Sequence, residues 1–228
     1  MKRIMATTIA TTVALTPLLA AGNEAEQRLE DAATVFSEIM TAPDQGISHD
    51  LLQKAHCVAI VPDLKTAAFV VGAKYGKGYL TCRRADDGGW SAPATVRIEG
   101  GSVGFQIGAS STDLIMLVMT ERGATKLMSS EFTLGAEASA AAGPVGRTAT
   151  AQTDVQVSAD ILSWSRSQGL FAGVALEGAT LREDLDDNAL LYGKSLGTSE
   201  IVRTAVRAPK AAARLIALLT KYSAIEDD

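Results

Sequence analysis

The residues Gly100-Gly-Ser-Val-Gly104 match the pattern G-x-S-x-G, which in some hydrolases holds a nucleophilic serine between a strand and a helix. Here the residues that follow alternate between apolar and small or polar types, which is the period of a strand. The chain has two histidines, His49 and His56, and both precede Ser102, whereas that hydrolase fold places its histidine after the serine. We therefore interpret Ser102 as a strand or turn residue.

The chain has two cysteines, Cys57 and Cys82, which together with His49 and His56 supply the ligand types of a zinc site. Their spacing matches none of the usual zinc patterns, and a zinc site needs three or four converging ligands. We therefore expect no metal site. In an exported protein two cysteines are better interpreted as one disulfide, and two buried free thiols are the alternative.

Other chemistry-bearing patterns are weak. Gly76-Lys77-Gly78 lacks the spacing of a phosphate-binding loop and is interpreted as a hairpin turn. The adjacent carboxylates Asp86-Asp87 and Asp186-Asp187 are expected on solvated surface, because neighbouring side chains on extended backbone diverge. Without a nucleophile, base or metal constellation we expect a protein that is not an enzyme and that needs no cofactor.

Basic residues gather in one region, with tyrosines between them. We select as candidate ligands of anionic phospholipid Lys65, Lys74, Tyr75, Lys77, Arg83 and Arg84. The glycines around Gly76 predict a hairpin there, which would place Lys74 and Lys77 at its tip. The alternative is a solvated hairpin end without a ligand.

The composition is that of a globular protein, with 228 residues, 47% hydrophobic, and a net charge of −5. An acidic chain argues against general nucleic-acid binding, which needs a basic surface. Lys2 and Arg3, an apolar run and small residues up to Gly22 follow the order of a secretory signal peptide. We therefore expect a signal peptide over residues 1–22, with an uncleaved anchor as the alternative. The protein would then be exported, periplasmic or secreted, and residues 23–228 would form one domain.

The predicted fold class is α+β, with a mainly antiparallel, strongly curved sheet, open or barrel-like, and helices at both chain ends packed on it. The first helix has an apolar face that could dock on the core or lie on a bilayer, and docking is the simpler interpretation because the helix is acidic. A central hairpin with its turn at 109–113 is expected, and its second strand is apolar enough to be buried on both faces. The predicted helices are 23–41, 48–55, 121–130, 184–192 and 209–222, and the predicted strands are 57–61, 67–75, 77–84, 94–99, 147–158, 161–167 and 170–177.

Several blocks resemble the SYLF-domain family in the same order along the chain. The blocks are AHCVAIVP (55–62), GAKYGKGYLTCR (72–83), GGWSAPA (88–94), GGSVGFQIG (100–108), DLIMLVM (113–119), AAGP (141–144) and SRSQGLFAGVALEG (165–178). This family comprises the lipid-binding domain of yeast actin-patch proteins and their secreted bacterial relatives. The resemblance implies a non-enzymatic domain whose partner is phospholipid or a membrane surface. An envelope structural or protein-interaction module without a lipid ligand is the alternative, and its protein partner is unknown.

Overall fold

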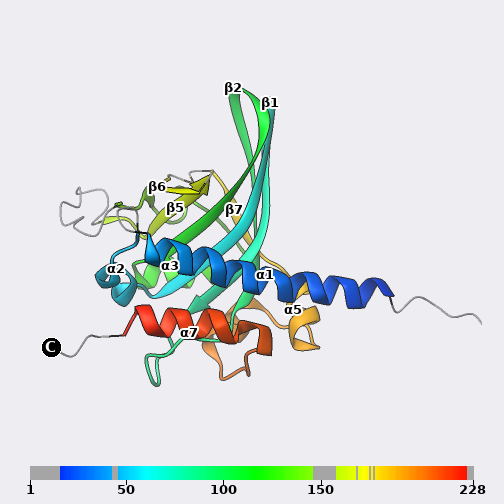
Figure 1. The fold of residues 1–228 in the computed structure, drawn as a ribbon, viewed down its shortest axis with the longest axis vertical. Coiled ribbons are helices and arrows are strands. Elements are labelled where there is room, and N and C mark those ends of the chain that lie inside the picture. The colour runs from blue at the N-terminus through cyan, green and yellow to red at the C-terminus, as the bar shows by residue number, and fades with distance from the viewer. Residues whose placement is uncertain are drawn as a thin grey trace, which may run out of the picture.

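A computed structural model describes residues 16–42, 46–145, 158–167, 169–174, 176 and 178–224. Its centre is a strongly curled mixed sheet, a half-barrel, against which helices from both ends of the chain pack (Figure 1). The predicted α+β class is thus confirmed. The pairing is antiparallel except between β4 and β5, which run parallel.

Helices begin and end the described chain, and α3 lies between the strands β2 and β3. The strands are β1 (Cys57–Cys82), β2 (Ala94–Val118), β3 (Glu131–Thr133), β4 (Ala140–Ala142), β5 (Ile161–Ser167), β6 (Leu170–Gly173) and β7 (Thr180–Glu183). The helices are α1 (Thr16–Thr41), α2 (His49–Lys54), α3 (Glu121–Leu127), α5 (Leu185–Tyr192), α6 (Thr198–Arg203), the 3-10 turn η1 (Lys210–Ala212) and α7 (Ala213–Tyr222). The predicted strand at 147–158 lies almost wholly outside the described residues.

Two very long strands, β1 and β2, replace the six shorter strands that we expected from this part of the sequence. They pair antiparallel from Cys57 opposite Val118 to Leu80 opposite Ala94. The predicted hairpin turns at Gly76 and at 109–113 are therefore wrong, and the real connection follows Cys82. The predicted end of the first strand at Pro62 is also wrong, because the strand continues through a register shift between Val61 and Leu64.

The glycines that suggested a turn at Gly76 instead allow β1 to cross itself. A Cβ atom on Gly78 would lie 2.1 Å from the carbonyl oxygen of Ile60, and one on Gly76 would lie 2.9 Å from the side chains of Val61 and Leu64. Neither glycine needs a positive φ. Their missing side chains therefore serve the close approach of the two halves of β1 and not a turn.

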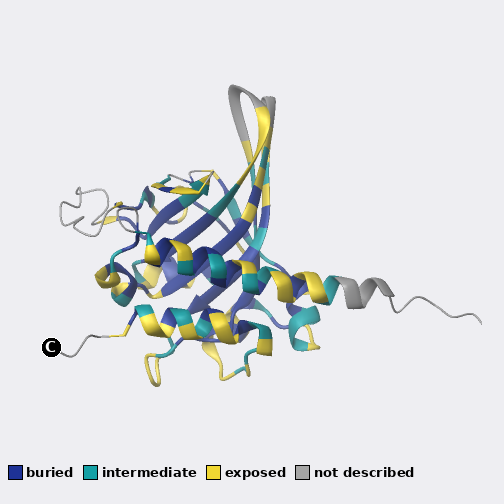
Figure 2. Cartoon of the chain, in the orientation of Figure 1, coloured by how far each residue is buried: buried dark blue, intermediate teal, exposed yellow. Residues whose placement is uncertain are grey.

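In their middle parts, β1 and β2 stay paired with each other but leave the rest of the sheet and return to it. They form a two-stranded arm (Figure 1). We define the arm as residues 64–75 of β1 and 100–112 of β2. The other edge of β2 pairs with β7 at Val96–Glu99 and with β5 at Asp113–Val118. Among the described pairings, the arm strands therefore pair with each other alone, and Figure 2 shows exposed residues along both of them.

The helices cover the sheet with apolar faces, and α1 docks on the core as the simpler interpretation predicted. Leu29, Phe36 and Ile39 of α1 are fully buried and belong to one cluster with Leu215 and Leu219 of α7. Helix α1 begins at Thr16, seven residues before the predicted start at Asn23. No helix within the described ranges is long and apolar enough to cross a membrane.

The apolar run from Leu114 to Val118 is buried on both faces, as its composition predicted. Ile115 and Leu117 point into the cluster under α1, whereas Leu114, Met116 and Val118 point into a second cluster inside the curl of the sheet. This alternation follows from the period of a strand. A strand between two layers of apolar side chains anchors the half-barrel.

The Ala- and Gly-rich stretch before Pro144 leaves space for a bulky neighbour. A Cβ atom on Gly143 would lie 2.0 Å from the ring of Trp164. The indole Nε1 of Trp164 donates to the carbonyl oxygen of Pro144 at 3.0 Å, and the ring is fully buried. The small residues thus make the space in which the largest buried side chain packs.

Asp160, just ahead of β5, ties α3 to the sheet. Its carboxylate accepts hydrogen bonds from the Thr120 hydroxyl at 2.6 Å, from Arg122 Nε at 3.2 Å and from the Ser139 N–H at 2.9 Å. Burial alone would raise the pKa of Asp160, but these hydrogen bonds outweigh it and lower the pKa to about 2.

We expect Asp160→Asn to lower the free energy of unfolding at neutral pH by about 2 kcal/mol. Because the folded-state pKa lies below the unfolded value, the contribution is complete above about pH 4 and is lost as the pH falls toward 2. Urea denaturation across this pH range should show the variant and the wild type converging in acid. Asp86→Asn, at an exposed carboxylate, is the control, and an equal loss in both variants would contradict the role of Asp160.

Candidate functional site

The structure divides the sequence-predicted ligand residues among three places. Lys65, Lys74 and Tyr75 lie on the arm, Lys77 lies in an internal ion-pair network, and Arg83 and Arg84 lie at the connection between β1 and β2. Lys65, Tyr75 and Lys77 nevertheless line one open recess of about 590 Å³ beside α1, together with Glu24 and Asp31, whereas Arg83 and Arg84 line another. Each place has its own chemistry.

The arm carries two positive charges and no negative ones. Lys65 and Lys74 are the charged residues of 64–75 and 100–112. The Lys65 side chain is 65% exposed and pairs with Asp63 at 2.7 Å, a surface pair that contributes little to stability. Tyr75, one residue after Lys74, is 48% exposed. The arm thus presents lysines and a tyrosine to solvent while the protein as a whole is acidic.

Lys77 lies beneath α1 and not at a hairpin tip. Its ammonium group lies 2.9 Å from an Asp184 oxygen and 2.8 Å from an Asp187 oxygen, and Arg28 of α1 donates to the other Asp187 oxygen at 2.7 Å. Burial lowers the pKa of Lys77, but its bonds to Asp187 and Asp184 outweigh this and raise it. The network joins α1, β1 and the start of α5.

Asp184 and Asp187 are residues of this network that the sequence reasoning missed. The expectation that Asp186-Asp187 is solvated surface is correct for Asp186, which is exposed, and wrong for Asp187, which is buried. Asp184 is the N-cap of α5 and accepts the Asp187 N–H at 3.2 Å. A cap signal was readable, but the lysine partner lies 110 residues away in sequence from Asp187.

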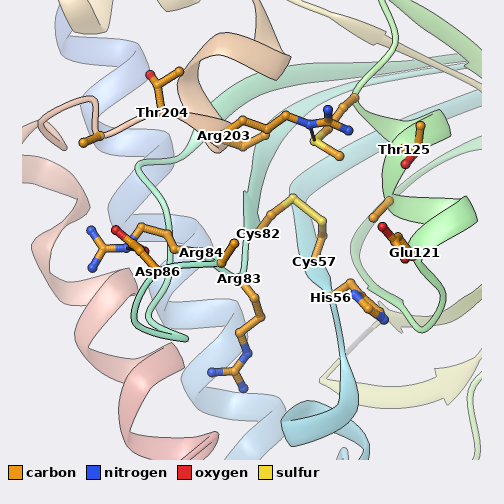
Figure 3. A pocket seen from close by; sticks show the side chains of 15 residues that line it. His56, Cys57, Cys82, Arg83, Arg84, Asp86, Glu121, Thr125, Arg203 and Thr204 are labelled. Carbon is orange, nitrogen blue, oxygen red and sulfur yellow. Dashed lines mark hydrogen bonds and ion pairs between the residues drawn. A yellow bond between two sulfur atoms is a disulfide. The ribbon is translucent and has the colours of Figure 1, made fainter.

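Arg83 and Arg84 stand beside an open recess of about 710 Å³, whose lining also includes the disulfide and parts of α3 and α6. The guanidinium of Arg83 lies 4.3 Å from the centre of the Trp90 ring and donates to the Gly88 carbonyl at 3.0 Å. Desolvation lowers the pKa of Arg83. Arg84 pairs with Asp87, and Figure 3 shows both guanidinium groups directed away from the disulfide.

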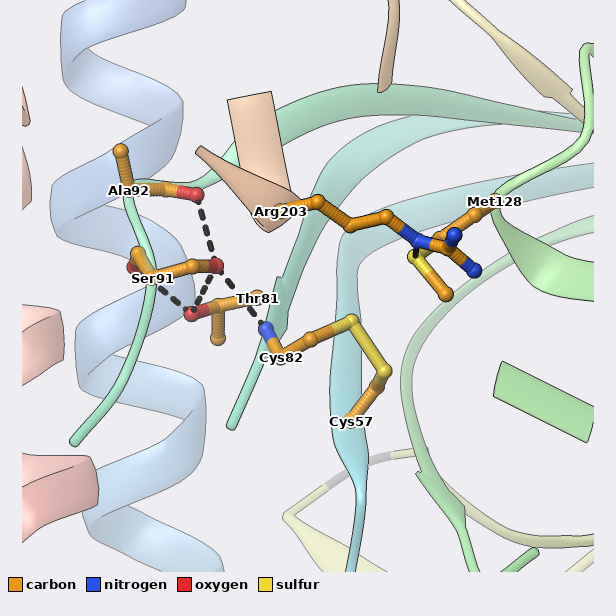
Figure 4. Close-up of a disulfide and its surroundings, with 7 residues drawn as sticks. All are labelled: Cys57, Thr81, Cys82, Ser91, Ala92, Met128 and Arg203. Atoms are coloured by element: carbon orange, nitrogen blue, oxygen red, sulfur yellow. Dashed lines mark hydrogen bonds between the residues drawn. A yellow bond between two sulfur atoms is a disulfide. The ribbon is translucent and has the colours of Figure 1, made fainter. Parts of the chain in front are cut away.

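Cys57 and Cys82 form a disulfide, which confirms the predicted pairing and excludes free thiols (Figure 4). They are the first and last residues of β1, and their Cα atoms lie 3.9 Å apart. The Cys82 N–H donates to the Ser91 hydroxyl at 3.0 Å. The disulfide therefore joins the two ends of β1, the strand whose middle part forms one side of the arm.

The described part of the chain holds no group of three or more potential metal ligands. Ser102 lies within β2 opposite Gly72, so it is a strand residue and not the serine of a strand-to-helix turn.

Comparison with known proteins gives a consistent result. A family model described as "Ysc84: Las17-binding protein actin regulator" matches residues 99–222. The chain is 34% identical over 181 residues to LAS seventeen-binding protein 3 of Saccharomyces cerevisiae, which covers 77% of this chain and 39% of that protein. It is 32% identical over 191 residues to human SH3 domain-containing YSC84-like protein 1, which covers 82% of this chain and 55% of that protein. The matches thus cover roughly two-fifths to just over half of these relatives.

Proposed function

The chain belongs to the Ysc84 (SYLF-domain) family, and on this premise we propose that it is a non-enzymatic module that binds anionic membrane surfaces through its arm. The observation that supports this most is the charge of the arm, where Lys65 and Lys74 are the only charged residues. Anionic lipids attract such lysines at close range, each by about 1 kcal/mol. The acidic body would orient the arm toward the membrane by repulsion.

The amino-acid sequence of the arm suits the same function. Residues 68–71 of β1 are Ala-Phe-Val-Val, and residues 102–107 of β2 are Ser-Val-Gly-Phe-Gln-Ile. Apolar residues between basic positions are typical of elements that enter the headgroup region. Tyr75 adds an aromatic residue of the kind enriched at membrane interfaces.

This proposal changes the role of α1 in membrane contact. The sequence offered the apolar face of α1 as a possible bilayer contact, but that face is buried against the core. Lys77 is likewise committed to Asp184 and Asp187. Among the predicted lysines, those of the arm are left open to a membrane.

We further propose that the signal-like segment over residues 1–22 exports the protein, so that the arm meets a membrane outside the cytoplasm. Cleavage after Ala21 or Gly22 would remove the first turns of α1 and keep Leu29, Phe36 and Ile39 on the core. Mass spectrometry of the protein from the compartment in which it accumulates would give the mature N-terminus. An intact Met1 would contradict export by cleavage.

Vesicle co-sedimentation tests the membrane proposal. The full chain should pellet with vesicles of phosphatidylcholine and phosphatidylglycerol at low salt, and less at high salt. The double variant Lys65→Glu, Lys74→Glu should bind at least roughly 30-fold more weakly, because two attractions of about 1 kcal/mol each are lost. The matched control is Lys194→Glu with Lys210→Glu, which makes the same change of charge at exposed positions away from the arm. Equal loss in both double variants, or no pelleting of the wild type, would contradict the proposal.

A protein partner is the second candidate, because the yeast relative is named as a Las17-binding protein. The arm also offers strand edges without a described third strand, to which an extended segment could add. This candidate predicts that the arm variant loses a protein partner while vesicle binding of the wild type is absent. The vesicle experiment therefore separates the two.

A further inference from the structure

The recess beside the disulfide has a cation, Arg203, whose charge no described carboxylate neutralises. Arg203 is the last residue of α6, it is exposed, and its Nε lies 3.2 Å from the sulfur of Met128. Among the described residues no carboxylate pairs with it, in contrast to Arg84. Figure 4 shows its side chain extending past Cys82 toward Met128. Its guanidinium is therefore available to an anion.

The floor of the recess is apolar. It is formed by the Cys57–Cys82 disulfide, Ala124 of α3 and Val202 of α6, each buried, with Met128 at the side. Methionine and sulfur surfaces are polarizable and adapt to flexible apolar ligands. The volume of about 710 Å³ falls within the range of sites that hold one small molecule.

Asp86 and Arg83, two other charged residues that line the recess, already have partners in the fold. Asp86 lies 3.6 Å from Arg84, and Arg83 stacks on Trp90. Glu121 lies on α3 near His56, on the helix toward which the Arg203 side chain extends (Figure 3). An anionic head would thus be drawn to the Arg203 guanidinium and repelled by the Glu121 carboxylate.

From this juxtaposition we propose that the recess binds a single-chain amphiphile with an anionic head, of the fatty-acid class. The anionic head of the ligand would pair with the guanidinium of Arg203, and its acyl chain would lie on the apolar floor over the disulfide. This inference does not rest on the arm, because none of the arm residues lines the recess.

Calorimetric titration of the full chain with dodecanoate, kept below its micelle concentration, tests the proposal. We expect one bound dodecanoate per chain, no binding of butyrate, and weaker binding of uncharged dodecanol. Arg203→Gln should weaken dodecanoate binding about tenfold or more, because a charge-assisted bond is lost. Arg207→Gln, an exposed residue outside the recess, is the matched control and should bind as the wild type does.

A second variant tests where the acyl chain of the bound dodecanoate lies. Thr125→Trp places a bulky ring in the recess from an exposed position, so it should abolish binding while the protein stays folded. The arm variant Lys65→Glu, Lys74→Glu should keep dodecanoate binding even where it loses vesicles. The proposal is overturned if the wild type does not bind dodecanoate, if dodecanol binds as tightly, or if Arg203→Gln and Thr125→Trp both bind as the wild type does.

Discussion

Replacing both cysteines, Cys57→Ala with Cys82→Ala, should lower the free energy of unfolding by roughly 3.5 kcal/mol, the value that chain entropy gives for a loop of this length. The two cysteines are 25 residues apart, and they join the two ends of β1. Without the bond, the unfolded chain gains the freedom to separate these ends. The arm would then have a looser base.

Urea denaturation of oxidised wild type, reduced wild type and the double variant would measure this loss. The reduced wild type is the control, because it breaks the same bond without removing the sulfur atoms from their buried positions. Both forms should lose similar stability. A double variant as stable as the oxidised wild type would show that the disulfide does not constrain the fold.

Gly78→Ala should destabilise the protein by at least about 3 kcal/mol, at the upper end for overpacking a core. The new Cβ atom would lie 2.1 Å from the carbonyl oxygen of Ile60 and 2.7 Å from the Cα atom of Val61. Both are backbone atoms, so no side-chain rotation can relieve the contact. The two halves of β1 would have to move apart at the point where the half-barrel curls.

Gly101→Ala is the matched control for this prediction. Gly101 lies on β2 in the arm, and the nearest atom to its added Cβ would be the carbonyl oxygen of Gly72 at 3.9 Å. Its stability should stay within about 0.5 kcal/mol of the wild type, as for most surface changes. Equal stability of the two alanine variants would contradict the crossing of β1.

Local patterns in the sequence predicted the elements that local forces determine. The unbroken apolar run at 114–119 predicted a strand buried on both faces. The helix predicted at 48–55 is α2, which begins where the Ser48 hydroxyl accepts the Leu51 N–H. The disulfide was predictable because two cysteines permit a single pairing. Each of these depends on residue type and near neighbours alone.

The turns were mispredicted because a glycine has two physical uses. The absence of a Cβ atom permits a positive φ in a turn, and it also permits close approach of another backbone. Gly76 and Gly78 serve the second use, which depends on Ile60 and Val61 across the crossing. The sequence pattern alone does not distinguish the two.

The residues predicted to form one binding site lie in different places because contacts distant in sequence, which local patterns do not reveal, determine their positions. Lys77 looked like a surface lysine because its carboxylate partners, Asp184 and Asp187, are more than a hundred residues away. Arg203 and the recess could not be found from the sequence, because α3, α6 and the ends of β1 meet only in the fold. The positions of Lys77 and Arg203 are therefore set by contacts between residues that are far apart in the sequence.

Placing a tryptophan on the arm tests the central claim that the arm contacts the membrane. Tyr75→Trp puts an indole at a 48% exposed position, whereas the native Trp90 and Trp164 are 4% and 0% exposed and serve as internal references. With anionic vesicles whose acyl chains are brominated, the emission of the introduced indole should shift to the blue and be quenched, and that of the wild type should not change. If the Tyr75→Trp protein pellets with these vesicles and its emission is unchanged, the arm is not the element that touches the bilayer.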